Sequence, residues 1–318
     1  MLRRIRLRQS VRKQRTGYRS RFGGLWTDRP DANDALETRL GGTGSAPPLD
    51  ASLEPQLRHW IERGYVVLPG AVDPEVCDRL RSDVHSIWDS EDESYLVEVG
   101  PVRHPLRPSL RSGPYKLLDL HARNEDARSA LFADPIRRFL RTVFERDPLL
   151  FQSLTFETGS TQPIHQDTAY VVTTRPMELA AVWIALEDIQ PGTGELMYYP
   201  GSHRFPEHVF KGGARNWNAR RDGEEAHHRY LEDLHAKAES MGLELEAFLP
   251  RKGDALIWSA DLAHGGGEIT QTGATRWSLV GHFCPDDVEP YYFSYRPRQR
   301  RLAPAPGGGQ LASAYYRV

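Results

Sequence analysis

The sequence is poor in cysteine and has no long hydrophobic run. Cys77 and Cys284 are the only cysteines among 318 residues. Two thiols so far apart indicate neither a disulfide framework nor a cysteine zinc site. They favour a reducing compartment, so we expect a cytoplasmic protein. No stretch reaches the roughly 18 apolar residues of a membrane-spanning helix. No apolar stretch follows the basic N-terminus, so we expect no secretory signal.

The sequence also lacks a large net charge. Its 41 Lys and Arg residues against 43 Asp and Glu residues give a formal net charge of −2. This balance argues against a nucleic-acid partner held by bulk positive charge. The charge is uneven, because ten of the first thirty residues are Arg or Lys and only Asp28 opposes them. We expect residues 1–48 to form a basic, flexible arm. The alternative is an arm in peripheral contact with an anionic surface, such as phospholipid or acidic glycan.

Helical signals come first in residues 49–295, which we expect to form a single domain. Residues 55–62 predict a short helix, and residues 64–70 predict a short buried strand closed by a turn. Asp73-Pro74 and Asp134-Pro135 each place an N-cap before a proline at the first helical position. Apolar residues follow both pairs at helical spacing. These helices carry no catalytic constellation, so we expect them to be packing elements.

Short strands dominate from about residue 150 onward. Apolar residues alternate with polar ones or form continuous runs, and turn-forming residues separate the segments. The predicted strands lie at 150–156, 179–186, 195–199, 255–258 and 277–283. Many short strands at this spacing are typical of a β-sandwich or barrel. The sequence therefore predicts a mainly β domain.

Two further segments depart from the strand pattern. Residues 207–250 form a polar insertion, whose helical stretch begins near Asp222 and stops near Gly242. An insertion of this length is often a lid over a functional site. The segment 296–318 is rich in proline and glycine, and we expect a C-terminal tail of loop or frayed chain.

One short motif contains two candidate metal ligands. In Ile164-His-Gln-Asp-Thr168, residues His165 and Asp167 would point to the same side of a strand. His264, at the end of another candidate strand, can supply a third ligand. Two histidines and one carboxylate on one face of a metal leave three coordination positions open, as in non-haem Fe(II) oxygenases. A 2-oxo acid can occupy two of these positions and dioxygen the third.

A dicarboxylate cosubstrate also needs a cation at its far end. Arg276 lies 12 residues after His264, on the next candidate strand. Its planar guanidinium can bind a carboxylate through two hydrogen bonds. A metal triad followed by such an arginine is far more specific than a lone His-x-Asp motif.

These pieces and their order resemble the phytanoyl-CoA dioxygenase (PhyH) family of Fe(II)- and 2-oxoglutarate-dependent oxygenases. The resemblance covers residues 55–284. The matching pieces are Gly64-Tyr-Val-Val-Leu68, Gln152-Ser-Leu-Thr-Phe156, Pro163-Ile-His-Gln-Asp167, Trp183-Ile-Ala-Leu-Glu-Asp188, Gly194-Glu-Leu196, Pro200-Gly-Ser-His203, Gly253-Asp254 and His264-Gly265. The resemblance implies a double-stranded β-helix, the cupin-like jelly roll, with N-terminal helices on one side. Fe(II), 2-oxoglutarate and dioxygen are the cofactor and cosubstrates that it implies.

The resemblance also implies roles for individual residues. His165, Asp167 and His264 match the iron ligands, and Arg276 matches the arginine that binds the distal carboxylate of 2-oxoglutarate. Lys116 stands where the family has a lysine that contacts the cosubstrate. Gln166 and Trp183 stand at positions that line the cosubstrate pocket. Related halogenases replace the carboxylate ligand with a small residue, so the aspartate of this chain disfavours halogenation.

Other histidines carry no motif of their own. His203, in Pro-Gly-Ser-His, is predicted to shape the wall of the site. The histidines of the insertion are expected on a solvated helix surface: His227, His228 and His235. Three more have no partner motif: His104, His121 and His282.

The expected activity is hydroxylation of an unactivated C–H bond in a small molecule. Four arginines near the insertion suggest an anionic one, such as a sugar acid, a phosphorylated compound or a lipid head group: Arg215, Arg220, Arg221 and Arg251. The same iron site could instead catalyse desaturation, epimerisation or cyclisation. A third alternative is a jelly-roll module that binds metal without catalysis. The sequence does not predict an oligomeric state.

Overall fold

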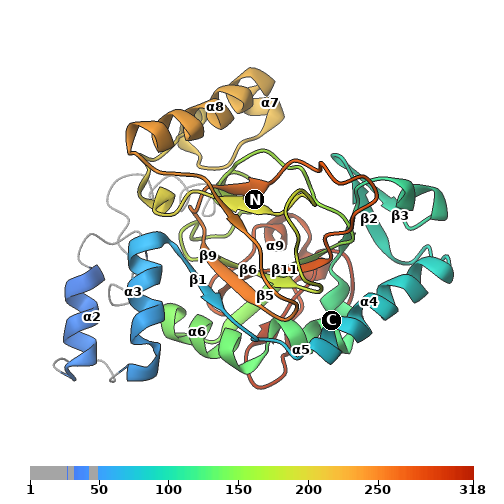
Figure 1. The fold of residues 1–318 in the computed structure, drawn as a ribbon, viewed down its shortest axis with the longest axis horizontal. Coiled ribbons are helices and arrows are strands. Elements are labelled where there is room, and N and C mark those ends of the chain that lie inside the picture. The colour runs from blue at the N-terminus through green and yellow to red at the C-terminus, as the bar shows by residue number, and fades with distance from the viewer. Residues whose placement is uncertain (1–26, 28–31, 43–48) are drawn as a thin grey trace.

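The computed structural model describes Thr27, residues 32–42 and residues 49–318. Its centre is a large antiparallel sheet with helices on both sides (Figure 1). In spatial order the main strands are β1 (Tyr65–Leu68), β9 (Ala255–Ser259), β6 (Ala180–Ala185), β11 (Ser278–Pro285), β5 (Pro148–Phe156), β4 (Lys116–Leu118), β2 (Leu96–Val99) and β3 (Val102–Pro105). The five strands predicted from about residue 150 are confirmed, since four belong to this sheet and the fifth is β7.

A second, smaller sheet holds three strands in the order β10 (His264–Gly266), β7 (Leu196–Tyr198) and β8 (Glu246–Phe248). A single bridge between His165 and His264 extends it by one residue pair. The two sheets stay separate among the described strands and do not close into a barrel. The predicted mainly β architecture is confirmed.

Strand β6 at the centre is apolar throughout, because both faces of the large sheet are buried there. In β6, Trp183 and its period-two neighbours belong to one apolar cluster with Val280 of β11 and Trp258 of β9. The alternate residues, such as Ile184 of β6 and Leu279 of β11, belong to another cluster that packs against helices. The continuous apolar run at 179–186 is therefore a central strand with helices on one face and a cavity on the other.

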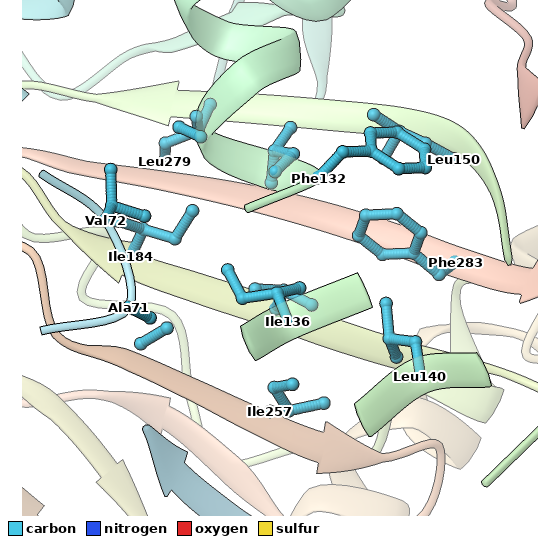
Figure 2. Packing of buried hydrophobic residues seen from close by; sticks show 14 of the residues in the cluster. Ala71, Val72, Phe132, Ile136, Leu140, Leu150, Ile184, Ile257, Leu279 and Phe283 are labelled. Atoms are coloured by element: carbon cyan, nitrogen blue, oxygen red, sulfur yellow. The ribbon is translucent and has the colours of Figure 1, made fainter. Parts of the chain in front are cut away.

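Helices cover the outer face of the large sheet. The longer helices of the N-terminal half are α2 (Ala32–Leu40), α3 (Glu54–Arg63), α4 (Pro74–Asp89) and α6 (Asp134–Phe144). The shorter α5 (Glu125–Leu131) lies between α4 and α6 in the sequence. Figure 2 shows the packing, in which Ile136 and Leu140 of α6 lie over Ile257 and Phe283 of the strands. The predicted helices at 55–62 and behind both Asp-Pro pairs are confirmed. The predicted N-cap is confirmed for Asp73 but was wrong for Asp134, which is the first residue of α6 and follows the N-cap residue Ala133.

The insertion lies on the opposite side of the sheet. It contains α7 (Ala219–Asp222) and α8 (Glu224–Ser240), which stand at the top of Figure 1, away from α4, α5 and α6. Residues 246–248 of the same insertion form β8 and extend the small sheet beside β7. The predicted helix therefore exists, and the end of the insertion is part of the sheet architecture.

Part of the predicted flexible arm is folded. Residues 32–40 form α2, in which Ala32 and Leu36 are buried one helical turn apart against the main core. Arg39 forms an ion pair with Glu145. The expectation of a flexible arm was wrong for this segment, because a two-residue apolar stripe is too short to stand out in a polar sequence. The arginine cluster of residues 1–26 lies outside the described residues.

The C-terminal segment is also ordered, contrary to the expectation of a loop or frayed tail. The strands β12 (Ala303–Pro304) and β13 (Gln310–Leu311) pair with each other, and β13 pairs in parallel with β5. Ser313 follows and donates a hydrogen bond of 2.7 Å to the buried carboxylate of Asp119. Glycine and proline here form turns between packed residues. In the part of the chain described, no helix is long and apolar enough to cross a membrane.

Candidate metal centre

The three predicted metal ligands lie close together at the single β-bridge between His165 and His264. His264 begins β10, and His165 exchanges backbone hydrogen bonds of 2.8 and 2.9 Å with it. Asp167 begins a one-turn 3-10 helix, Asp167–Ala169, so the prediction that both residues share a regular strand was wrong. The intervening Gln166 is nevertheless extended, with φ −111° and ψ 139°. That single extended residue is enough to place His165 and Asp167 on one side.

The side chains form a compact donor set. Asp167 Oδ1 lies 3.9 Å from His165 Nε2 and 3.8 Å from His264 Nε2. One ligand atom from each of the three residues lies within 4.8 Å of the others, and all three residues are buried. This spacing suits direct ligation of one ion, because metal–nitrogen and metal–oxygen bonds are about 2 Å long.

Hydrogen bonds behind the ligands fix their orientation. His165 Nδ1 lies 2.8 Å from the carbonyl oxygen of Pro163, and His264 Nδ1 lies 2.9 Å from that of Leu262. Each Nδ1 therefore carries the proton and leaves the lone pair on Nε2 for a metal. The indole Nε1–H of Trp258 donates a 2.8 Å hydrogen bond to Asp167 Oδ2. This bond leaves Oδ1 as the oxygen directed toward the two imidazoles.

Burial sets the protonation states that a metal requires. Burial lowers the pKa of His165 to about 3 and also lowers the pKa of His264. Burial by itself would raise the pKa of Asp167, but His264 and His282 hold it below its ordinary value. At neutral pH the site therefore offers two neutral imidazoles and one carboxylate, the forms that bind divalent metals.

Arg276 is a buried cation without a carboxylate partner in the described part of the chain. It precedes β11, is 3% exposed, and its Nη1 donates a 3.1 Å hydrogen bond to Ser278. Its Nε has no hydrogen-bond partner there. The guanidinium lies over the rings of Phe156 and Trp183, 5.4 and 5.5 Å from their centroids. Burial lowers its pKa to about 10, which still leaves it charged at neutral pH.

One cavity joins the arginine to the metal ligands. It has a volume of about 300 Å³, and its lining includes the three candidate ligands and Arg276. A buried charge without a partner is costly, so an anion inside the cavity would be strongly favoured. The arrangement therefore suits a carboxylate that binds at one end while a metal is held at the other.

The other predicted cosubstrate residues differ in their placement. Trp183 and Lys116 both line the cavity. The ammonium of Lys116 lies 3.3 Å from the carboxylate of Glu98. Gln166 does not line the cavity, because its Nε2 donates a 2.7 Å hydrogen bond to the carbonyl oxygen of Asp261. The prediction that Gln166 lines the cosubstrate pocket was wrong, since the backbone turn after it points its side chain away.

Two residues near the triad were missed from the sequence. His282 is buried on β11, and its Nε2 lies 3.8 Å from Asp167 Oδ1. Gln162 Nε2 lies 3.2 Å from His165 Nε2, the atom offered to a metal, so metal binding must turn this amide aside. A signal existed for His282, since it is six residues after Arg276 on the same face of a period-two strand.

The insertion contacts the metal-binding segment through α8. The hydroxyl of Tyr230 accepts a 2.9 Å hydrogen bond from the backbone N–H of Gln166, between the two ligands. His227 Nε2 lies 2.5 Å from the hydroxyl of Tyr170, and the His227 ring stacks on Trp217 at 4.4 Å. His227 is thus part of a packed contact, contrary to the expected solvated surface.

His203 and the insertion arginines serve the fold rather than the cavity. His203 is buried against the end of α3, where its Nε2 lies 3.1 Å from the carbonyl oxygen of Ile61, so the predicted role in the site wall was wrong. Arg215 forms ion pairs with Glu207 and Asp261. Arg221 pairs with Asp222, and neither arginine lines the metal cavity.

Fold and site together define the class. The double-stranded β-helix, two histidines and an aspartate around one point, and a buried arginine in the same cavity are the features of iron- and 2-oxoglutarate-dependent oxygenases. The chain belongs to the phytanoyl-CoA dioxygenase (PhyH) family, which matches residues 60–276. No sequence among the curated proteins matches the chain.

Solved structures of iron and 2-oxoglutarate enzymes share the fold. The epimerase SnoN, crystallised with Fe3+, α-ketoglutarate and nogalamycin RO, is 17% identical, with a TM-score of 0.55 over 75% of this chain and 85% of its own. The carbocyclase SnoK from nogalamycin biosynthesis is 16% identical, with a TM-score of 0.57 over 84% and 97%. EctD from S. alaskensis, with 2-oxoglutarate and 5-hydroxyectoine, is 18% identical, with a TM-score of 0.53 over 76% and 78%. The predicted cupin-like jelly roll is confirmed.

Proposed function

We propose that this protein is an Fe(II)- and 2-oxoglutarate-dependent hydroxylase that acts on a C–H bond of a small molecule. The observation that carries the proposal is the buried Arg276, which shares one cavity with the His165, Asp167 and His264 donors. A module that only stored metal would need no buried guanidinium beside it. The cavity therefore favours catalysis with a dicarboxylate cosubstrate over metal binding alone.

The residues divide the work as follows. His165, Asp167 and His264 would hold the iron on one face and leave the opposite face open. Iron(II) with 2-oxoglutarate supplies an oxidation that consumes dioxygen and yields succinate and carbon dioxide. Arg276 binds the distal carboxylate of 2-oxoglutarate and sets its direction along the cavity. Trp183 and Phe156 cover the guanidinium, which strengthens this interaction by keeping water away from it.

Other oxidative outcomes on the same site remain alternatives. Two structures with this fold are described as an epimerase and a carbocyclase. Hydroxylation, epimerisation and ring closure share the iron and cosubstrate and differ in where the substrate carbon lies. Product analysis by mass spectrometry separates them, because hydroxylation adds one oxygen atom and the other two outcomes do not.

The insertion does not support an anionic primary substrate. The ion pairs of Arg215 and Arg221 with acidic neighbours already balance their charges. We also propose a reducing, cytoplasmic environment. The observation that supports it is that Cys77 and Cys284 are both free and buried.

Binding of 2-oxoglutarate to Arg276 variants tests the proposal. Arg276→Ala removes two charge-assisted hydrogen bonds worth about 2 kcal/mol or more, which predicts a dissociation constant raised at least about 30-fold. Arg276→Lys keeps the charge but loses the planar pair of donors, so its effect should be intermediate. Calorimetry on anaerobic, iron-loaded protein measures both.

Arg251→Ala, an exposed arginine outside the cavity, is the matched control. An unchanged affinity in Arg276→Ala would show that another cation binds the cosubstrate and would overturn the proposal. Release of succinate from 2-oxoglutarate in the wild type then establishes turnover.

A further inference from the structure

A second hollow opens directly beside the metal cavity. It has a volume of about 180 Å³ and shares part of its wall with that cavity. The shared wall consists of Arg103, Gln152, Tyr170, Val171 and Tyr315. We call this second hollow the tyrosine groove. The two hollows therefore adjoin at these five residues, which face both the metal cavity and the groove.

The groove concentrates exposed aromatic side chains. Tyr170, Tyr291 and Tyr295 are 37%, 42% and 53% exposed, and all three line it. The rings of Tyr291 and Tyr295, one turn apart at α9 (Tyr292–Tyr295), have their centroids 5.6 Å apart. Large apolar groups left in contact with water at one place commonly mark a binding surface.

Cations complete the wall of the groove. Two guanidinium groups lie close to the ring of Tyr315, that of Arg103 at 5.5 Å and that of Arg296 at 5.4 Å from the ring centroid. Arg103 also donates a 3.1 Å hydrogen bond to the Tyr315 hydroxyl. Arg296 donates to the carbonyl oxygen of Ala314 and has no carboxylate partner among the residues described. The wall is thus rich in hydrogen-bond donors.

Acidic side chains are missing from this wall. Within the described residues, no Asp or Glu lines the tyrosine groove. Glu98 lies 3.7 Å from Arg103 but lines the metal cavity, and Asp119, which accepts a hydrogen bond from the Ala314 N–H, is fully buried behind the wall. A polyol ligand such as a sugar needs acceptors for its many hydroxyl donors, and carboxylates usually supply them. An aromatic ring with oxygen substituents instead offers a π face to the tyrosines and acceptors to the guanidiniums.

We propose that the tyrosine groove is a substrate subsite that binds an oxygen-substituted aromatic ring. This inference rests on the proposed function, because it assigns the groove to the substrate of the same iron site. The ring stacks against Tyr291 and Tyr295, and its oxygen accepts from Arg296. The part of the substrate that reacts extends past Tyr170 toward the metal ligands.

The C-terminal segment builds one side of the subsite. Ser313 Oγ accepts hydrogen bonds of 3.0 Å from the backbone N–H groups of Tyr315 and Tyr316, and it also donates to Asp119. These bonds fix the backbone position of Tyr315 beside the two arginines. A segment expected to be loose thus becomes a determinant of substrate choice.

Binding of a neutral aromatic probe tests the inference. The probe is 2-naphthol, which lacks the carboxylate that Arg276 would attract. Calorimetry uses the full chain, loaded anaerobically with Fe(II) and 2-oxoglutarate so that the cosubstrate end of the cavity is filled. The matched comparison ligands are decahydro-2-naphthol, with the same shape class but no π system, and maltose, a polyol.

We expect 2-naphthol to bind about tenfold more tightly than decahydro-2-naphthol, and maltose not to bind. Tyr295→Ala should weaken 2-naphthol about three- to tenfold, whereas Tyr295→Phe should retain the affinity because the ring remains. Arg296→Gln should weaken it as well. Arg298→Ala, an exposed neighbour outside the groove, should change nothing. Thermal melting checks that each variant is folded.

Any one of four results would overturn the inference. These are absence of 2-naphthol binding, equal binding of the saturated analogue, preference for maltose, or wild-type affinity in both Tyr295→Ala and Arg296→Gln. If the protein still releases succinate in these cases, the proposed iron- and 2-oxoglutarate-dependent activity stands and only the subsite proposal is contradicted. If the protein binds 2-naphthol but never releases succinate, the proposed function is contradicted instead.

Discussion

A single hydrogen bond determines how Asp167 can act as a ligand. Trp258 donates to Oδ2, so Oδ1 alone is directed toward His165 and His264. A carboxylate held this way would offer a metal Oδ1 alone, which would leave room for a cosubstrate. The indole therefore contributes to the open face of the centre without touching the metal.

Trp258→Phe should lower iron affinity by about tenfold or more, because hydrogen bonds to ligating groups are typically worth about 10- to 100-fold in affinity. The remaining ring keeps most of the apolar packing. Anaerobic Fe(II) titration measures the change, and Trp88→Phe, which removes an indole far from the centre, is the control. Equal affinities in the wild type and Trp258→Phe would contradict this role.

Among single residues, those that could be predicted from the sequence are the ones whose spacing along the chain indicates a shared face or a neighbouring strand. The pair His165 and Asp167 could be found because one residue separates them, and Arg276 because its distance from His264 fits a neighbouring strand. The contacts of His282 and Trp258 with Asp167 cross between β11, β9 and a turn. Strand periodicity places His282 on the same face as Arg276, but no periodicity links either His282 or Trp258 to Asp167, so only the folded chain shows these contacts.

At the scale of elements, α8 supports the metal-binding segment rather than standing apart from it. Its buried stripe includes Tyr230, Leu234 and Ala238, which pack in one cluster with Ile164 and Ala169 on either side of the ligands. The Tyr230 hydroxyl also accepts from the Gln166 N–H. The helix thus holds the turn that presents Asp167.

Tyr230→Phe should cost about 1–3 kcal/mol in the free energy of unfolding, because it leaves a buried backbone N–H without an acceptor. Iron affinity should fall as well, since the unsupported N–H lies between two ligands. Chemical denaturation and Fe(II) titration measure the two effects, with the exposed Tyr295→Phe as a control. A variant as stable as the wild type, with full iron affinity, would show that α8 does not support the centre.

Element prediction succeeded where capping and periodicity were strong and failed where they were weak. Asp73 caps α4 through its side chain, as its Asp-Pro signal indicated. The weak stripe of α2 gave no such signal, and Asp167 starts a 3-10 turn where a strand was expected. Tertiary contacts determine the conformation of these short elements. Such contacts cannot be inferred from the local pattern of a single sequence.

At the scale of the whole molecule, the C-terminal segment closes the structure beside β5. Asp119 is fully buried and accepts hydrogen bonds at Oδ2 from Ser313 and from the Ala314 N–H. Burial raises the pKa of this carboxyl group. The end of the chain therefore supplies partners for a buried acid that lies almost two hundred residues earlier.

Ser313→Ala should lower the free energy of unfolding by about 1–3 kcal/mol, because it removes a donor from a buried carboxylate. It should also loosen Tyr315 and weaken ligand binding in the tyrosine groove. Ser112→Ala, at an exposed serine, is the control for denaturation. Equal stability of both variants would mean that the C-terminal segment is not part of the cooperative unit.

The metal-free protein should lose thermal stability as the pH falls. Burial lowers the pKa values of four buried histidines below that of the free side chain: His121, His165, His203 and His264. Their unfolded forms bind protons near pH 6.5, so the unfolded state gains more protons below that pH and stability falls. Burial raises the pKa of Asp119, and this single group acts in the opposite direction to the four histidines.

Calorimetric melting of the metal-free protein from about pH 7.5 down to about pH 5 measures this trend. Saturating Fe(II) should oppose the loss, because a metal that binds the folded state and not the unfolded chain stabilises the folded state by mass action. A melting temperature that rises or stays constant over this range would show that the histidines are not buried in neutral form.

The number of iron ions bound per chain shows whether His165, Asp167 and His264 together form an iron site. The matched variants are His264→Ala, which removes a proposed ligand, and His282→Ala, which removes an imidazole equally close to Asp167 but outside the triad. Anaerobic equilibrium dialysis followed by elemental analysis counts the iron bound to each chain. We expect one Fe(II) per chain in the wild type and in His282→Ala, and almost none in His264→Ala. Full iron binding by His264→Ala, or its loss in His282→Ala alone, would contradict this expectation.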